Sequence, residues 1–190
     1  MSLRTRLAHS PLFAGTVFQA ALIPFALGLA YVLAVPLGGR IAWNLEAVVL
    51  GAMATLPMLA LLGLLAISGW PPYREMSGQV REFVHLLFRH AAPGAVLLIS
   101  VLAGIGEELL IRGVLQGWLM QRWPPEWAIV VAAVVFGMAH AISRLYFAFA
   151  TLIGVYLGVL YYLTDNLLVV IVTHALYDWI VIRLYLRGRR

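Results

Sequence analysis

The chain has 190 residues, of which 63% are hydrophobic and 11% are charged. An ordinary soluble domain has about 25% charged residues, so this composition excludes an ordinary soluble core and predicts a bundle of transmembrane helices. The formal net charge is +5, and the basic residues are all arginines that lie mostly at the ends of apolar runs. We therefore interpret the charge as a signal of membrane orientation and expect no nucleic-acid partner. The chain has no cysteine, which excludes disulfides and thiolate metal sites.

Six apolar runs are candidates for membrane spans, because about 20 mostly apolar residues cross roughly 30 Å of hydrocarbon. The first run is too long for the core of a signal peptide and has no clear small-residue cleavage site, so we expect it to be a retained span. The fourth run is the shortest. The six runs cover residues 12–35, 45–69, 93–120, 127–142, 145–163 and 166–186.

The stretch 70–90, between the second and third runs, alternates charged and apolar residues. This pattern is typical of an amphipathic helix at a membrane surface. The predicted fold is therefore all-α: a polytopic transmembrane helix bundle of about six spans plus one interfacial amphipathic helix. No repeat or low-complexity segment is visible, so residues 1–190 are predicted to form a single integral membrane domain.

The distribution of arginines predicts the orientation, since six spans place both termini on the same side. Ten arginines then lie on the side of the termini and two on the other side. By the positive-inside rule, both termini are predicted to face the cytoplasm, in the cell (inner) membrane. The ten are Arg4, Arg6, Arg74, Arg81, Arg89, Arg144, Arg183, Arg187, Arg189 and Arg190, and the two are Arg40 and Arg122.

Three charged residues, Glu107, Glu108 and Arg112, interrupt the third apolar run. A charge at the centre of a span costs about 2.5–3.5 kcal/mol on insertion scales, so we expect these charges to be paired. Glu108 and Arg112 are four residues apart, on one helix face and in the favourable acid-first order. Glu107 points about 100° away from Glu108. The spacing therefore predicts a Glu108–Arg112 pair and leaves Glu107 available.

The fourth and sixth runs each contain a histidine in an apolar context. The fourth contains Phe136-Gly-Met-Ala-His140, and the sixth contains His174-Ala-Leu-Tyr-Asp178, with its histidine and acid on one helix face. Each group alone also has a structural interpretation: a core histidine, an ion pair, a tie between helices, or packing by Phe136. Together they indicate a functional site, because ionisable residues within membrane spans are rare and generally functional.

Peptide hydrolysis is a chemistry that these residues could perform. A carboxylate in a low-dielectric site becomes a useful general base near neutral pH, and Glu107 is the candidate, with His140 sharing the attacking water. His174 could donate to the oxyanion, and Asp178 could hold the His174 ring. No G-x-S-x-G nucleophile motif is present.

A metal site is the competing chemistry. An acid at 107 or 108, together with His140, His174 and Asp178, supplies enough ligands for zinc. However, H-E-x-x-H is absent, and Arg112 beside the acids disfavours a divalent cation. We therefore predict no metal and no other cofactor.

The three motifs, Glu107-Glu108-x-x-x-Arg112, Phe136-x-x-x-His140 and His174-x-x-x-Asp178, resemble those of the CPBP family. This family comprises CAAX prenyl proteases and bacteriocin-processing enzymes, also called Abi or Rce1-like intramembrane glutamic proteases. The resemblance covers residues 104–179.

The resemblance implies a metal-independent endopeptidase in which a glutamate activates water. By motif position, Glu107 resembles the activating glutamate, His140 its partner, and Glu108 with Arg112 the supporting pair. His174 and the residue four positions later resemble the oxyanion-stabilising pair, and Phe136 is a candidate substrate contact.

Asp178 departs from the pattern, because the prenyl-protein branch typically has asparagine there. An ionised aspartate cannot donate to an oxyanion, so the substrate class stays open. The expected partner is a peptide or membrane-anchored protein in the lipid bilayer, and the sequence does not predict an oligomeric state.

Two functions of other classes are also compatible with a polytopic membrane protein. One is a non-enzymatic immunity factor or assembly scaffold with a vestigial site. The other is a transporter that uses Glu107, His140 and His174 as a proton relay. The transporter is disfavoured because no paired half-repeats are visible.

Overall fold

The computed structural model describes residues 11–88, 91–92 and 94–187, and every regular element in this part of the chain is a helix. The all-α prediction is therefore confirmed for the described residues. Five arginines of the predicted charge asymmetry, Arg4, Arg6, Arg89, Arg189 and Arg190, lie outside them. The helices are α2 (Pro11–Val32), α3 (Leu45–Ile67), α4 (Pro71–Phe88), α5 (Ala95–Glu108), the π-helix η1 (Leu109–Gln116), α6 (Gly117–Met120), α7 (Pro125–Ala139), α8 (Arg144–Thr164) and α9 (Leu167–Arg187).

Within the described residues, each of the six predicted spans is mostly helical. Four helices, α2, α3, α8 and α9, are long and apolar enough to cross a membrane. The third predicted span consists of α5, η1 and α6 in succession, and α7 is an apolar helix of only 15 residues. The membrane character of the chain is thus supported, whereas the number of about six crossings stays a prediction.

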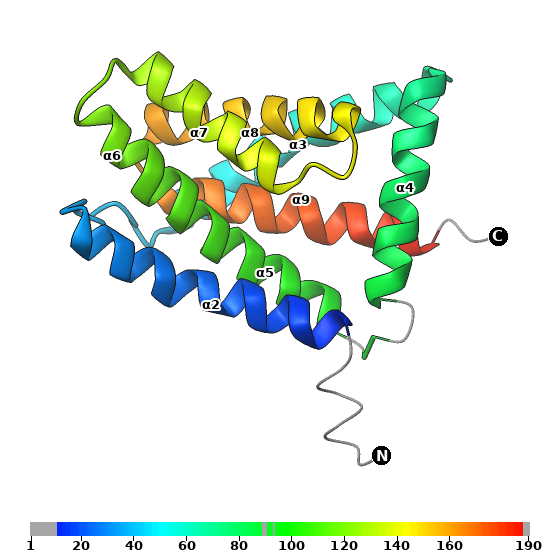
Figure 1. Cartoon of the computed structure of the whole chain (residues 1–190), viewed down its shortest axis with the longest axis horizontal. Helices are drawn as coiled ribbons and strands as arrows, with labels where there is room; N and C mark the ends of the chain where they lie inside the picture. Colours follow the sequence, from blue (N-terminus) through cyan, green and yellow to red (C-terminus); the bar gives the residue numbers. More distant parts are fainter. Residues whose placement is uncertain (1–10, 89–90, 93, 188–190) are drawn as a thin grey trace, which may run out of the picture.

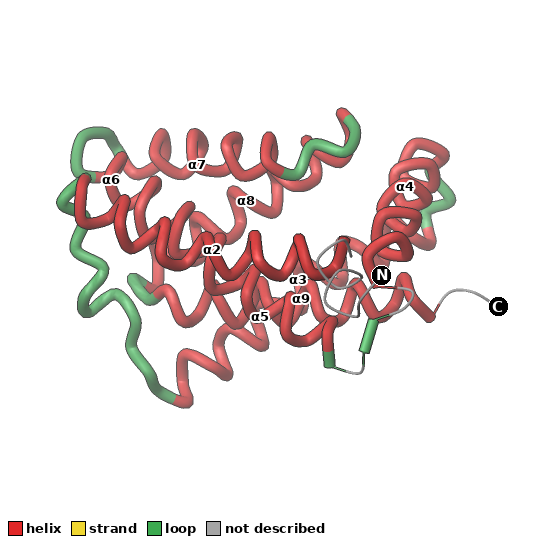
Figure 2. Tube along the Cα trace, turned by 60° about the horizontal axis from the view of Figure 1, so that its bottom comes forward, coloured by secondary structure: helices red, strands yellow, loops and turns green. Residues whose placement is uncertain are grey.

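The long helices lie side by side, and α4 runs across them at one end of the bundle (Figure 1). The described start of α2 and the end of α9 lie near α4. The loop that joins α2 to α3 lies at the other end (Figure 2). The helix pairs α7–α8, α5–α9, α3–α9 and α2–α5 are packed against each other. This arrangement brings α5, α7 and α9, which carry the candidate residues, into one bundle.

Close packing of α9 against α3 and α5 depends on two glycines. A Cβ atom at Gly104 would lie 2.9 Å from the Cβ of Ala175, and one at Gly51 would lie 2.6 Å from the carbonyl oxygen of Val169. The Thr173 hydroxyl also donates to the Gly51 carbonyl at 3.0 Å. Small residues therefore allow the backbones to approach closely, as is usual for membrane helices.

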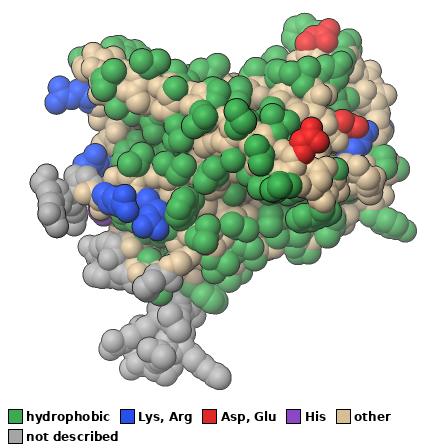
Figure 3. Space-filling view, turned by 180° about the vertical axis from the view of Figure 1, so that it is seen from behind, with side chains coloured by type: hydrophobic (Ala, Val, Ile, Leu, Met, Phe, Trp, Pro, Cys, Tyr) green, Lys and Arg blue, Asp and Glu red, His purple; other side chains and the backbone are tan. Residues whose placement is uncertain are grey.

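Helix α4 is amphipathic, as predicted for residues 70–90. Its buried residues recur at helical spacing and face the bundle, and the Ser77 hydroxyl lies 3.2 Å from the hydroxyl of Tyr185 on α9. Across the face shown in Figure 3, apolar side chains cover the middle and charged side chains gather towards the two ends. Such a distribution suits a protein surrounded by lipid. The buried residues of α4 are Tyr73, Met76, Val80, Val84 and Phe88.

Candidate functional site

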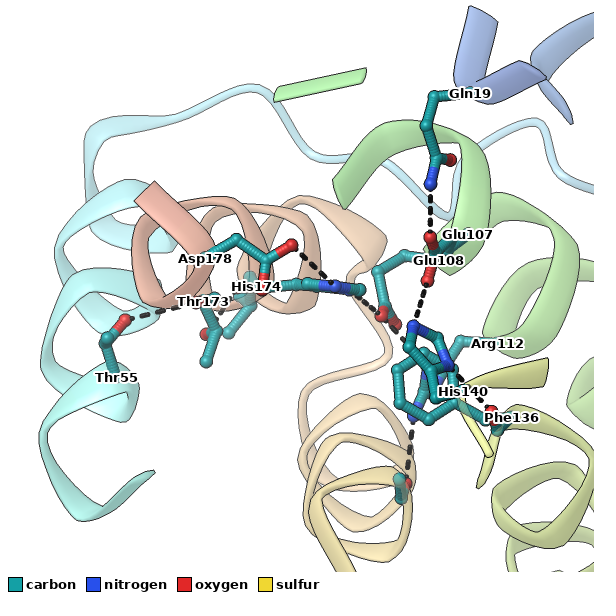
Figure 4. Close-up of polar contacts among 12 residues, drawn as sticks. Gln19, Thr55, Glu107, Glu108, Arg112, Phe136, His140, Thr173, His174 and Asp178 are labelled. Carbon is teal, nitrogen blue, oxygen red and sulfur yellow. Dashed lines mark hydrogen bonds and ion pairs between the residues drawn. The ribbon is translucent and has the colours of Figure 1, made fainter. Parts of the chain in front are cut away.

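The polar residues of the three predicted motifs meet in one cluster (Figure 4). The two glutamates are the last two residues of α5, and the arginine follows in η1. One histidine directly follows the end of α7, and the other lies with the aspartate on α9. The cluster contains Glu107, Glu108, Arg112, His140, His174 and Asp178, linked by the contacts described below.

Glu108 and Arg112 form an ion pair in which both side chains are fully buried. The Arg112 Nη1 donates to Glu108 Oε1 at 2.9 Å, and its Nη2 donates to the Gly154 carbonyl at 3.0 Å. The guanidinium also lies 4.6 Å from the centre of the Phe136 ring. The predicted pair is therefore confirmed, and it links η1 to α7 and α8.

The helix that carries this pair is not regular. Glu108 is the last residue of α5, and the π-helix η1 begins at Leu109. In a π-helix the hydrogen bonds join residues five apart, and such turns are frequent at functional sites. The sequence predicted a regular helix throughout, so the π-helix is a feature that the residue pattern did not indicate.

His174 lies between two carboxylates. Its Nδ1 donates to Glu108 Oε1 at 2.7 Å, and its Nε2 lies 3.5 Å from Asp178 Oδ2. The predicted proximity of His174 and Asp178 is confirmed, while the bond to Glu108 was not predicted. Glu108 Oε1 thus accepts from both Arg112 and His174, which fixes the histidine ring against the buried ion pair.

Glu107 faces His140, with 3.4 Å between Glu107 Oε2 and His140 Nε2. His140 Nδ1 lies 2.8 Å from the Phe136 carbonyl oxygen. Because a carbonyl only accepts, Nδ1 carries a hydrogen and donates it to Phe136. The other ring nitrogen, Nε2, is the one that faces Glu107. Helix α7 ends at Ala139, so His140 is the first residue after it and contacts Glu107 near the end of α5.

Phe136 lies between the two histidines. Its ring centre is 4.3 Å from that of His140 and 5.8 Å from that of His174, and the residue is buried. Its contacts with three polar residues of the site suit a packing role. Its predicted contact with substrate stays a prediction.

A cavity of about 670 Å³ adjoins the cluster. Its wall is mainly apolar and comes from α2, α3, α4, α5, η1, α7, α8 and α9, together with the segment that follows α7. Glu107, His140, His174 and Asp178 contribute polar atoms to this wall. The arrangement therefore sets an acid–histidine pair beside a space that suits an apolar chain.

Gln19 on α2 belongs to the site, although the motifs did not include it. Its Nε2 donates to Glu107 Oε1 at 2.7 Å, and its side chain lines the cavity. A polar residue within an apolar run is the signal that revealed the other site residues. The same signal, applied to the first span, could have found Gln19.

Among the described residues, no group of three or more histidine, aspartate or glutamate side chains is arranged to hold a metal ion. The competing set of zinc ligands suggested by the sequence is therefore not assembled in this part of the chain. The carboxylates instead contact Arg112, Gln19 and the histidines.

Comparison with known proteins gives one family match. Residues 89–180 match the family described as type II CAAX prenyl endopeptidase Rce1-like. No curated protein and no solved structure shows a significant match to the chain. The matched segment includes the two glutamates, the arginine, both histidines and the aspartate of the cluster, and it ends before the last turns of α9.

Proposed function

We propose that this chain is a glutamate-dependent intramembrane endopeptidase. The proposal starts from residues 89–180, which match the Rce1-like family of membrane proteases. The observation that carries the proposal is the contact between Glu107 and His140 at the wall of an apolar cavity. In this proposal the three catalytic motifs lie within residues 104–179, and the whole chain forms one membrane domain.

In the proposed reaction, Glu107 is the general base. Among the described residues, no hydrogen bond reaches Glu107 Oε2. His140 Nε2 lies 3.4 Å from this oxygen and, in the tautomer that carries its hydrogen on Nδ1, is proposed as a second acceptor. Two acceptors so close together can both bind one water through its two hydrogens. Glu107 removes a proton as the water oxygen bonds to the peptide carbonyl carbon. The C–N bond then breaks, and the proton is delivered to the leaving nitrogen.

His174 is proposed to donate to the oxyanion that forms on the carbonyl oxygen. Glu108 and Arg112 support it, because the bond from His174 Nδ1 to Glu108 holds the ring, and Arg112 holds Glu108 in turn. The Nε2 of His174 is then directed to the cavity side, near Asp178. A preorganised donor of this kind is commonly worth 10²–10³-fold in rate.

The proposed substrate is a peptide or protein segment held at the membrane. The cavity wall is mainly apolar and includes Glu107, His140, His174 and Asp178, which suits a lipid-bearing or apolar segment next to the scissile bond. We propose that no metal takes part and that the protein acts in the cell (inner) membrane with both termini in the cytoplasm.

The proposal is tested in cells that lack the chromosomal copy and express either wild type, Glu107→Gln or His140→Ala. Mass spectrometry of membrane proteins then compares their N- and C-termini. We expect new termini with the wild type and none with either variant. Glu46→Gln, an exposed change in the first turn of α3, is the matched control and should behave as wild type. Identical termini in all strains would support a non-enzymatic scaffold.

Metal independence is tested with purified protein in proteoliposomes. The probe is an internally quenched peptide with a farnesylated CAAX C-terminus, together with its unprenylated counterpart. Cleavage should continue after treatment with zinc chelators. Loss of cleavage that added zinc restores would instead favour a metal-dependent protease.

A further inference from the structure

We propose that Gln19 is a positioning residue that sets the orientation of the Glu107 carboxylate. This inference rests on the proposed function of Glu107. Gln19 lies on α2, outside the segment that matches the family. The active site would then include a helix that the three motifs do not contain.

The two oxygens of the Glu107 carboxylate have different surroundings. Oε1 accepts from Gln19 Nε2 at 2.7 Å, and Oε2 lies 3.4 Å from His140 Nε2 (Figure 4). The terminal torsion of a glutamate has a broad energy minimum, so the carboxylate can rotate unless a partner holds it. The bond from Gln19 holds Oε1 and thereby directs Oε2 towards His140.

The chemistry of both groups fixes which end of the amide faces the acid. An ionised carboxylate only accepts hydrogen bonds, so the NH₂ end of Gln19 must face Glu107. The carbonyl end of the amide is buried and accepts no hydrogen bond from the described residues. The hydrogen bond to Glu107 is therefore the one that orients this side chain within the described part of the chain.

The backbone of α2 is held close to α5 at this level. A Cβ atom at Gly106 would lie 2.9 Å from both the Gln19 carbonyl oxygen and the Leu22 Cβ. Gly106 directly precedes Glu107, so the close approach of the helices and the hydrogen bond occur at the same turn. Position 106 therefore allows Gln19 to reach the acid, which a larger residue would prevent.

The test compares two substitutions of nearly equal size. Gln19→Met keeps the length of the side chain and removes the donor, and Gln19→Glu keeps the shape and replaces the donor by an acceptor. A displacement of about 1 Å in a catalytic group can cost about 10²-fold, so we expect kcat for the farnesylated quenched peptide to fall by that order with little change in KM. Gln19→Glu should lose at least as much. Wild-type kcat in Gln19→Met would overturn the proposal.

The matched control is Thr16→Ala, one turn earlier on α2. The Thr16 hydroxyl donates to the Leu12 carbonyl of its own helix, so its loss should leave kcat unchanged. Gel filtration and thermal unfolding of each variant show whether the bundle is intact. If Gln19→Met does not fold, Gln19→Glu, which keeps both size and polarity, decides the question.

An infrared measurement separates this inference from the proposed function. The difference spectrum between wild type and Glu107→Gln isolates the carboxylate band of Glu107. Gln19→Met should shift this band, because a hydrogen bond to one oxygen is lost, and an unshifted band would overturn the inference. The infrared measurement needs no cleavage, so it decides the role of Gln19 even if wild-type protein does not cleave the peptide. Failure of the wild type to cleave the peptide would count against the proposed substrate and not against the role of Gln19.

Discussion

Glu107 and Glu108 are neighbours in the sequence, but their carboxylates contact different partners. Glu108 binds Arg112 and His174, and Glu107 contacts His140 and Gln19. The Glu108–Arg112 contact could be predicted because it is local, four residues apart on one helix face. The contacts of His174 with Glu108 and of Gln19 with Glu107 join helices far apart in the sequence. No local spacing encodes them, so they could not be predicted.

Removal of one partner of the buried Glu108–Arg112 ion pair should strongly destabilise the protein. Arg112→Met leaves the Glu108 carboxylate buried without its cation, and loss of one partner of a buried pair typically costs about 3–5 kcal/mol. We expect a fall of about that size in the free energy of unfolding, measured by denaturation in mixed micelles.

The double variant Arg112→Met/Glu108→Gln should be more stable than Arg112→Met alone, because the uncompensated charge is then absent. If the single variant is as stable as wild type, the pair contributes little. If the double variant is the less stable of the two, the cost comes from packing rather than from charge.

Cleavage activity should tolerate replacement of Asp178 by asparagine better than replacement by an apolar residue. Its Oδ2 lies 3.5 Å from His174 Nε2, and its side chain is 31% exposed at the cavity wall. The amide introduced by Asp178→Asn could still accept from His174 through its carbonyl and would add an N–H donor for the oxyanion. We therefore expect Asp178→Asn to cleave the quenched peptide roughly 10-fold faster than Asp178→Leu, or more. Equal rates for the two variants would argue against a role of this residue in holding His174.

At the scale of the elements, helix positions could be predicted closely and helix irregularities could not. The apolar runs 45–69 and 145–163 correspond to α3 and α8 to within a few residues. The π-helix η1 was missed because its residues, Leu109–Gln116, have the composition of an ordinary helix. The early end of α7 was missed for a similar reason, since the apolar pattern continues through Ile142.

The contact between α3 and α9 should be sensitive to the size of residue 51. A Cβ atom at Gly51 would lie 2.6 Å from the Val169 carbonyl oxygen and 2.8 Å from the Val172 Cβ. Gly51→Ala must therefore push the helices apart, and overpacking of this kind typically costs about 1–3 kcal/mol. Thermal unfolding in detergent should show the loss.

Gly63→Ala is the matched control on the same helix, because nothing lies within 4 Å of a Cβ atom there. Alanine has the higher helix propensity, so this variant should be as stable as wild type or slightly more stable. A similar loss in both variants would show that the backbone, and not the contact with α9, is responsible.

For the whole molecule, composition was enough to predict a helical membrane protein, but not the cavity. The cavity arises where α2, α3, α4, α5, η1, α8 and α9 surround the end of α7, and such a space depends on how helices pack rather than on any one of them. The orientation in the membrane stays a prediction from the arginine distribution.

The orientation can be tested directly because the chain contains no cysteine. Single cysteines are introduced by Gly38→Cys, in the loop between α2 and α3, and by Glu75→Cys, on the exposed side of α4. A membrane-impermeant maleimide added to spheroplasts should label position 38. The same reagent added to inverted membrane vesicles should label position 75. The reverse pattern would place the termini outside, and labelling of both positions from one side would contradict the arrangement of spans.

The short length of α7 also bears on how water reaches the site. Its 15 residues, at about 1.5 Å each, span roughly 22 Å, less than the roughly 30 Å of a hydrocarbon core. If α7 crosses the bilayer as predicted, the lipid beside it must thin or polar headgroups must sink inward. Because α7 ends just before His140, hydration would then extend towards Glu107 from the surface at that end. A substrate tethered at that surface would need to dip only part of the way into the bilayer, and the depth of its scissile bond below its anchor would then determine which peptides are cut.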